Sequence, residues 1–126
     1  MSFYRDDIVM AELSWSFIGE AYANYADFEQ ELIAAQTQSD FDATELVILA
    51  PAISVSYEVW EEDDEVEKDV IITADDGHFL SCGEIMFKLH NAVVAQLSDE
   101  DEHFFEGLKP LNLKATPPSY QLCLGS

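Results

Sequence analysis

Three histidines and two cysteines are the residues of this sequence that could bind a transition metal. The histidines, His78, His90 and His103, are separated by twelve and thirteen positions, and Cys82 lies 41 positions before Cys123. Zinc sites place at least two ligands within a few residues of each other. The spacing therefore predicts neither a structural nor a catalytic zinc site, and we expect no cofactor.

An alternation of acidic residues and a histidine resembles the start of a calcium-binding loop at Asp99, Asp101 and His103. An EF-hand loop also needs glycine at its sixth position and glutamate at its twelfth. Phe104 and Pro110 occupy those positions here, so the pattern does not predict a calcium site.

No group of residues has the spacing of a known catalytic motif. The sequence lacks a Gly-x-Ser-x-Gly elbow and a glycine-rich phosphate loop. Cys82 begins a predicted helix, whose dipole would lower the pKa of its thiol, but Glu84 and the negative net charge oppose that shift. His90 falls on the apolar side of the same helix, where a hydrogen-bonded core histidine is the simpler interpretation. We therefore predict that the protein is not an enzyme.

Carboxylates are the functional groups that the sequence holds in excess. Its 126 residues include 26 Asp and Glu against 5 Lys and Arg, a net charge of −21. Such a chain should not bind nucleic acid or anionic membranes directly, because both need Lys and Arg. A net charge of about 2–8 already keeps a small domain soluble, and a larger one costs stability through self-repulsion. The excess favours binding of a basic protein over a purely solubilising role.

The acidic residues concentrate in one segment that begins with two aromatic residues. Eight of the twelve residues 58–69 are acidic, and Tyr57 and Trp60 flank Glu58. In a strand, Glu58 and Trp60 share one face and Tyr57 points to the other. Aromatic side chains inside a charged rim are typical of protein–protein interfaces, although a single tryptophan can equally pack in a core. We expect a partner-binding site made of Tyr57, Glu58, Trp60, Glu61, Glu62, Asp63 and Asp64.

Hydrophobic periodicity predicts the elements that position this segment. Alternating apolar residues predict a half-buried strand over 8–17, and apolar residues at three- and four-residue steps predict a helix over 20–38. A short apolar run predicts a buried strand over 45–50, which Pro51 ends. The next strand, 53–60, should place Ile53, Val55, Tyr57 and Val59 on one face.

The acidic segment is expected to join two strands of a hairpin. Residues 68–74 regain apolar character and should pair with 53–60, with an acidic turn at 61–65 between them. A capping box at Ser81 and Glu84 then predicts the start of a second helix. Its apolar face is formed by Ile85, Leu89, Val93 and Leu97.

The C-terminal part contains fewer regular elements. Residues 103–108 are again mostly apolar. Pro110 and the prolines that follow it predict an irregular segment. Alternation of apolar and polar residues over 120–124 predicts a last strand, which could lie at a sheet edge. The order β-α-β-β-β-α-β predicts a single α+β domain over 1–126, with two main helices and a mixed or antiparallel sheet of about five strands.

The cellular compartment is predicted from targeting signals in the sequence. No apolar stretch matches a signal peptide or a membrane-spanning helix. We therefore expect a cytoplasmic protein, with Cys82 and Cys123 as reduced thiols in the core.

In these general features the chain resembles the immunity proteins of bacterial toxin systems. The resemblance covers a small, acidic α+β chain without catalytic residues, the stretch 58–69, and the aromatic residues Tyr57 and Trp60. Residues 83–91 and 103–108 also look like motifs of a small bacterial family, without an attached activity. The resemblance implies an inhibitor that blocks a basic toxin, and a nuclease is the class of toxin that it favours.

Two other functions stay open from the sequence. A DNA mimic or regulatory adaptor would occupy a nucleic-acid-binding protein with carboxylates at phosphate-like spacing. A small enzyme or ligand carrier would need a deep pocket that holds Cys82 or His90 next to carboxylates.

Overall fold

A mixed four-stranded sheet is the centre of the fold in the computed structural model, which describes residues 8–37, 41–98, 100–101 and 103–125. The strand order is β3–β2–β6–β5, and β2 is antiparallel to β3 but parallel to β6. The predicted α+β class is confirmed; the described residues form six strands rather than about five. The four strands of this sheet are β2 (Ala52–Glu61), β3 (Asp64–Thr73), β5 (Phe104–Asn112) and β6 (Ser119–Gly125).

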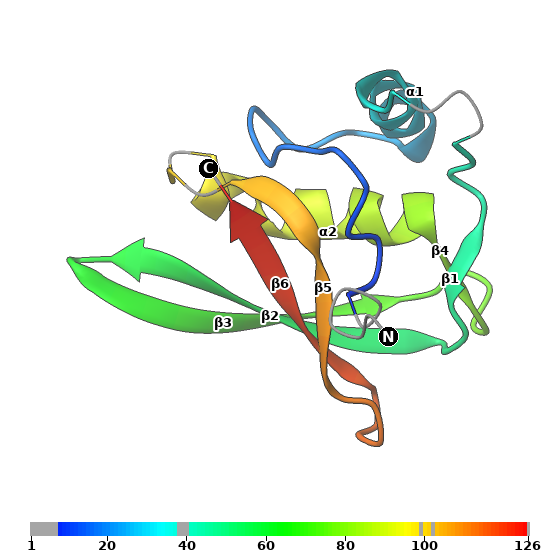
Figure 1. The fold of residues 1–126 in the computed structure, drawn as a ribbon. Helices are drawn as coiled ribbons and strands as arrows, with labels where there is room; N and C mark the ends of the chain where they lie inside the picture. Colours follow the sequence, from blue (N-terminus) through cyan, green and yellow to red (C-terminus); the bar gives the residue numbers. More distant parts are fainter. Residues whose placement is uncertain (1–7, 38–40, 99, 102, 126) are drawn as a thin grey trace, which may run out of the picture.

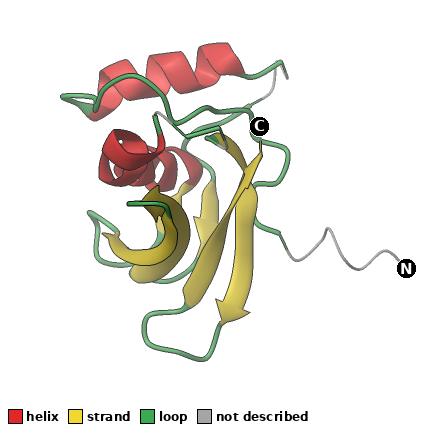
Figure 2. Cartoon of the chain, turned by 90° about the vertical axis from the view of Figure 1, so that its left-hand side faces the viewer, coloured by secondary structure: helices red, strands yellow, loops and turns green. Residues whose placement is uncertain are grey.

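Two helices lie on one side of this sheet. Helix α2 (Cys82–Leu97) lies between the sheet and helix α1 (Tyr25–Ala35), so the fold has three layers (Figures 1 and 2). Because α2 is covered on both sides, its predicted apolar face is buried together with Cys82, Met86 and His90. The outer helix α1 buries only Phe28 and Leu32.

The start of α2 forms half of the predicted capping box. Ser81, in the short strand β4 (Leu80–Ser81), caps the helix by accepting a hydrogen bond from the Glu84 N–H at 3.1 Å. The Glu84 carboxylate does not return the bond as predicted. It accepts instead from the Asp75 N–H at 2.6 Å and from Lys88 Nζ at 2.9 Å.

Helix α1 is shorter than predicted at its start. Asn24 is the N-cap and accepts a hydrogen bond from the Asp27 N–H at 2.9 Å. The preceding residues are not helical, because the Tyr22 backbone is bonded to the Asn91 side chain of α2. At its other end the helix also stops early, at Ala35 with Gln36 as the C-cap, whereas Gln38, the predicted end, lies outside the described residues.

The N-terminal segment is not the regular strand that was predicted. Among the described residues it pairs with the edge of β5 at two isolated bridges, Val9 with Leu108 and Ser16 with Phe104. Met10, which has a positive φ of 58°, turns the chain between them. The predicted alternation is nevertheless correct in its burial, since Leu13, Trp15 and Phe17 are buried.

The hairpin is longer than predicted, and its turn is shorter. The turn consists of Glu62 and Asp63 alone, with φ of 52° and 70°. Two left-handed residues suit the twist of a two-residue hairpin. Three residues predicted in the turn therefore belong to strands: Glu61 ends β2, and Asp64 and Glu65 begin β3, where their side chains stay exposed.

Three further features of the strands differ from the predictions. The run 45–50 is not a buried strand: only β1 (Leu46–Ile48) forms, paired with β4, and Leu49 is 73% exposed. At the C-terminus β5 continues through Pro110, where the register with β6 shifts. Strand β6 lies inside the sheet, between β2 and β5, rather than at an edge.

Candidate functional site

The predicted site residues of β2 divide between two faces of the sheet. Tyr57 points inward with Val55 and Val59, is only 5% exposed, and donates a hydrogen bond from its O–H to Gln96 Oε1 of α2 at 2.6 Å. Its position is structural, so it does not join the other site residues on the surface. The expected alternation in this strand is confirmed.

Trp60 lies on the outer face and does not pack in the core. It is 60% exposed, and its cross-strand neighbour is Glu65 of β3. Glu61 pairs with Lys68 across the hairpin at 3.1 Å, while Glu62, Asp63 and Asp64 form the exposed tip. A large aromatic side chain in this position is available for contact with a partner.

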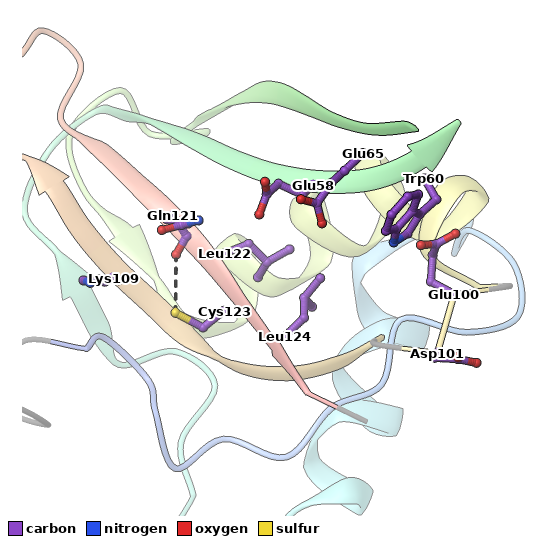
Figure 3. A pocket seen from close by; sticks show the side chains of 10 residues that line it. All are labelled: Glu58, Trp60, Glu65, Glu100, Asp101, Lys109, Gln121, Leu122, Cys123 and Leu124. Carbon is purple, nitrogen blue, oxygen red and sulfur yellow. Dashed lines mark hydrogen bonds between the residues drawn. The ribbon is translucent and has the colours of Figure 1, made fainter. Parts of the chain in front are cut away.

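A groove of about 880 Å³ opens beside Trp60, between β2 and β6 (Figure 3). Figure 3 places Trp60 and Glu100 at one end of it and Lys109 at the other. The lining comes from β2, β3, the segment before β5, β5 and β6: Glu58, Trp60, Glu65, Glu100, Asp101, Lys109, Gln121, Leu122, Cys123 and Leu124.

The groove exists because β2 and β6 pair over only part of their length. Residues 54–56 of β2 pair with residues 119–121 of β6, after which the two strands diverge (Figure 1). Leu122 and Leu124 carry their side chains on the inner, core-facing side of β6. They line the groove where this strand has separated from β2.

Negative charge dominates the groove as far as the described residues define it. Glu58, Glu65, Glu100 and Asp101 face a single lysine, Lys109. Repulsion from the Glu65 carboxylate, with smaller effects of lost hydration and of Glu67, raises the pKa of the Glu58 carboxyl. Crowded carboxylates of this kind favour a cationic ligand, which would relieve the repulsion.

Sequence reasoning identified the β2 side of this groove and missed the rest. Glu100 and Asp101 precede β5, and Lys109 and Gln121 lie on strands that were not placed next to β2. The parallel pairing of β2 with β6 carries no local sequence signal. The acidic pair Glu100 and Asp101 was the one feature of the sequence that hinted at the rest of the acidic lining.

A second, smaller hollow of about 320 Å³ lies between α1, β4 and the start of α2. Its apolar part includes Phe79 and Leu46, both substantially exposed, and Phe87. Neither Cys82 nor His90 lines this hollow or the larger groove.

The two candidate catalytic residues are both buried in the core. Burial, with Glu45 and Asp42 nearby, raises the pKa of the Cys82 thiol to about 12. His90 is fully buried, and its ring nitrogens contact the Trp15 indole N–H at 3.1 Å and the Glu20 carbonyl oxygen at 3.0 Å. Burial lowers the pKa of His90. His90 is the hydrogen-bonded core residue that its place in the sequence indicated.

Among the described residues, no three His, Cys, Asp or Glu side chains are grouped so as to hold a metal ion. Asp99 of the calcium-like pattern lies outside the described residues. Of the helices described, none has the length and apolar character needed to cross a membrane.

Comparisons with protein-family models, curated proteins and solved structures find no match for this chain.

Proposed function

We propose that this chain is a non-catalytic acidic protein that binds and inhibits a basic partner. In its specific form, it is a cytoplasmic immunity protein that blocks a bacterial toxin, and a nuclease is the favoured target. The observation that carries the proposal is Trp60, a tryptophan 60% exposed at the end of a groove that holds four carboxylates.

The mechanism would combine steric blocking with charge. A nuclease cleft must attract phosphate and is therefore basic, so carboxylates can occupy its phosphate positions. Long-range attraction would speed association, to about 10⁸–10⁹ M⁻¹s⁻¹ at low salt in the best-matched pairs. Trp60 would supply the apolar contact that slows dissociation, as aromatic residues do at the centre of interfaces.

Capture of the partner is the first experiment. Tagged protein is immobilised at low salt, an extract of the native host is passed over it, and bound proteins are eluted by a salt step. We expect one basic protein that is toxic when expressed alone and harmless when co-expressed with this chain. A captured protein that is harmless alone, or no basic protein at all, would contradict the immunity function.

Matched variants then locate the contact. Trp60→Ser should weaken binding of the captured protein by about 30-fold, whereas Leu49→Ser, which removes a side chain 73% exposed beyond β1, should leave it unchanged. Asp63→Asn with Asp64→Asn should slow association and flatten its salt dependence. Equal effects of the Trp60 and Leu49 variants would move the binding site elsewhere.

Mimicry of DNA is the second candidate, favoured by one regular feature of β3. Glu65, Glu67 and Asp69 are alternate, exposed residues of that strand. Their spacing is about 6.6 Å, from a rise of about 3.3 Å per residue. Capture of several unrelated DNA-binding proteins instead of one toxin would support this function.

A further inference from the structure

We propose that the groove between β2 and β6 receives an extended segment of the basic partner, which adds a strand to the free edge of β2. This inference rests on the proposed function and specifies its binding mode. The segment would alternate basic and small apolar side chains.

The register of the hairpin identifies the free backbone groups. Glu61 and Asp64 flank the two-residue turn and therefore form a hydrogen-bonded pair. Counting back from Glu61, every second residue of β2 directs its backbone N–H and C=O to β3. The residues between them direct their N–H and C=O toward β6, as the Ser54 N–H does in bonding to the Pro118 carbonyl at 2.9 Å. Glu58 and Trp60 belong to this second set.

Pairing of β2 with β6 stops before these groups are reached. Among the described residues it ends at Ser56 and Gln121. Glu58 and Trp60 therefore present two N–H and two C=O groups to the groove. A row of unpaired backbone groups at a strand edge is the template for strand addition.

The side chains around the groove specify the segment that fits. On the outer face of the sheet, residues of the inserted strand would lie beside Glu58, Trp60 and Glu65, which favours Arg or Lys for charge pairing and for stacking on the indole. On the inner face they would meet Leu122 and Leu124, which favours small apolar residues. Charge complementarity thus commits the groove to a basic strand.

A synthetic peptide tests the binding mode without knowledge of the partner. The probe is the blocked hexapeptide acetyl-(Arg-Val)₃-amide at low salt, with spermine as a control that has charge but no peptide backbone. Amide exchange is followed residue by residue by NMR. We expect the peptide to slow exchange of the Glu58 and Trp60 N–H groups and not of those of Glu65 and Glu67, which face away from β2. Spermine should slow neither pair.

Two proline variants provide a matched comparison. Glu58 and Glu67 are directly opposed on the same face, so Glu58→Pro and Glu67→Pro remove the same charge. Each removes an N–H that is not bonded to the neighbouring strand of the hairpin, but only Glu58→Pro removes one that faces the groove. We expect Glu58→Pro to weaken peptide binding about three- to tenfold relative to Glu67→Pro.

The outcomes separate this inference from the proposed function. Peptide binding without protection of Glu58 and Trp60, or absence of peptide binding, would overturn strand addition. Capture of a basic toxin could still succeed in either case. Protection of the two amides that rises with protein concentration alone would assign the groove to a second copy of the chain and would also overturn it. If Glu58→Pro does not fold, the exchange measurement on the unmodified protein decides.

Discussion

The indole N–H of Trp15 donates a hydrogen bond to Nδ1 of His90 at 3.1 Å, across 75 positions of sequence. The other ring nitrogen, Nε2, lies 3.0 Å from the Glu20 carbonyl oxygen and donates to it. Both bonds can form only when the ring is neutral and carries its proton on Nε2. His90 therefore connects the N-terminal segment to α2 in its uncharged state.

This arrangement predicts a loss of stability on acidification below about pH 6.5. Burial holds the pKa of folded His90 below 6.5, the value expected in the unfolded chain. The unfolded state then binds the proton first, so the free energy of unfolding falls as the pH drops from about 6.5 toward the folded pKa. Urea unfolding at pH 7 and pH 5 should show a smaller drop for His90→Gln than for the unmodified protein.

Two further variants control that measurement. His78→Gln changes an exposed turn residue and should retain the full drop. Trp15→Phe removes the donor to Nδ1 and should cost about 1–3 kcal/mol at pH 7. It should cost less at pH 5, because a protonated Nδ1 cannot accept that hydrogen bond. Identical pH dependence in all four proteins would show that His90 is not the group responsible.

Cys82 should be unreactive toward alkylating reagents in the folded protein. The pKa of its thiol is raised to about 12, mainly by burial, so the thiolate that reacts is scarce at pH 8. Iodoacetamide should modify Cys82 only at the rate of unfolding, which peptide mapping by mass spectrometry would detect. Rapid labelling of Cys82 at pH 8 without denaturant would return it to consideration as a nucleophile.

The helices and the inner face of β2 could be read from the sequence because their signals are local. Ser81 lies at the start of α2 and the apolar residues of that helix recur every four positions, so a cap and a buried face follow directly. The position of β6 was not readable. Its alternation is that of a strand, but its parallel pairing with β2 depends on contacts across more than sixty residues.

Part of the candidate site was also predictable from local signals. Trp60 and Glu58 were placed on one outward face because strand alternation is a local rule. The groove itself arises where β2 and β6 diverge, a property of sheet twist and register that no short stretch encodes. Tyr57 was included in the predicted site because its neighbours are acidic, although the alternation already assigned it to the inner face.

Gly107 should not tolerate a side chain. Its φ is 112°, and a Cβ there would overlap Ile8 Cγ2 and come within 3.1 Å of the Val9 carbonyl oxygen. Gly107→Ala should therefore cost about 1–3 kcal/mol from the backbone alone, with an added loss as the N-terminal segment is displaced from β5.

Gly77→Ala is the matched control for that substitution. Gly77 also has a positive φ, 75°, but open space surrounds its Cβ position. Thermal unfolding should rank the proteins in the order unmodified, Gly77→Ala, Gly107→Ala. If the two variants are equally destabilised, contact with the N-terminal segment contributes nothing at this position.

Repulsion across the hairpin should be reduced by a single charge reversal. Glu58 and Glu67 are directly opposed on the outer face, and repulsion from Glu65 first, then from Glu67, contributes to the raised pKa of Glu58. Like charges directly opposed in a sheet are destabilising, by about 0.2–1 kcal/mol per pair. Glu67→Lys should therefore raise the melting temperature at low salt, and Glu67→Gln should raise it by less.

Salt and pH provide two independent tests of this repulsion. Salt screens exposed charges, so moderate salt should raise the melting temperature of the unmodified protein more than that of Glu67→Lys. Because the folded pKa of Glu58 is raised, its contribution to stability is present below about pH 4.5 and is lost as the pH rises toward the folded pKa. This sign is opposite to that of His90, and Glu58→Gln should remove it.

A charge reversal elsewhere distinguishes the local pair from the overall charge. Glu31→Lys makes the same change in net charge on an exposed position of α1, which the middle layer of the fold separates from the sheet (Figure 1). Measured at moderate salt, where screening over that separation is nearly complete, it should raise the melting temperature less than Glu67→Lys does. Equal gains from both reversals would assign the effect to the net charge of −21 instead of to the opposed carboxylates of the hairpin.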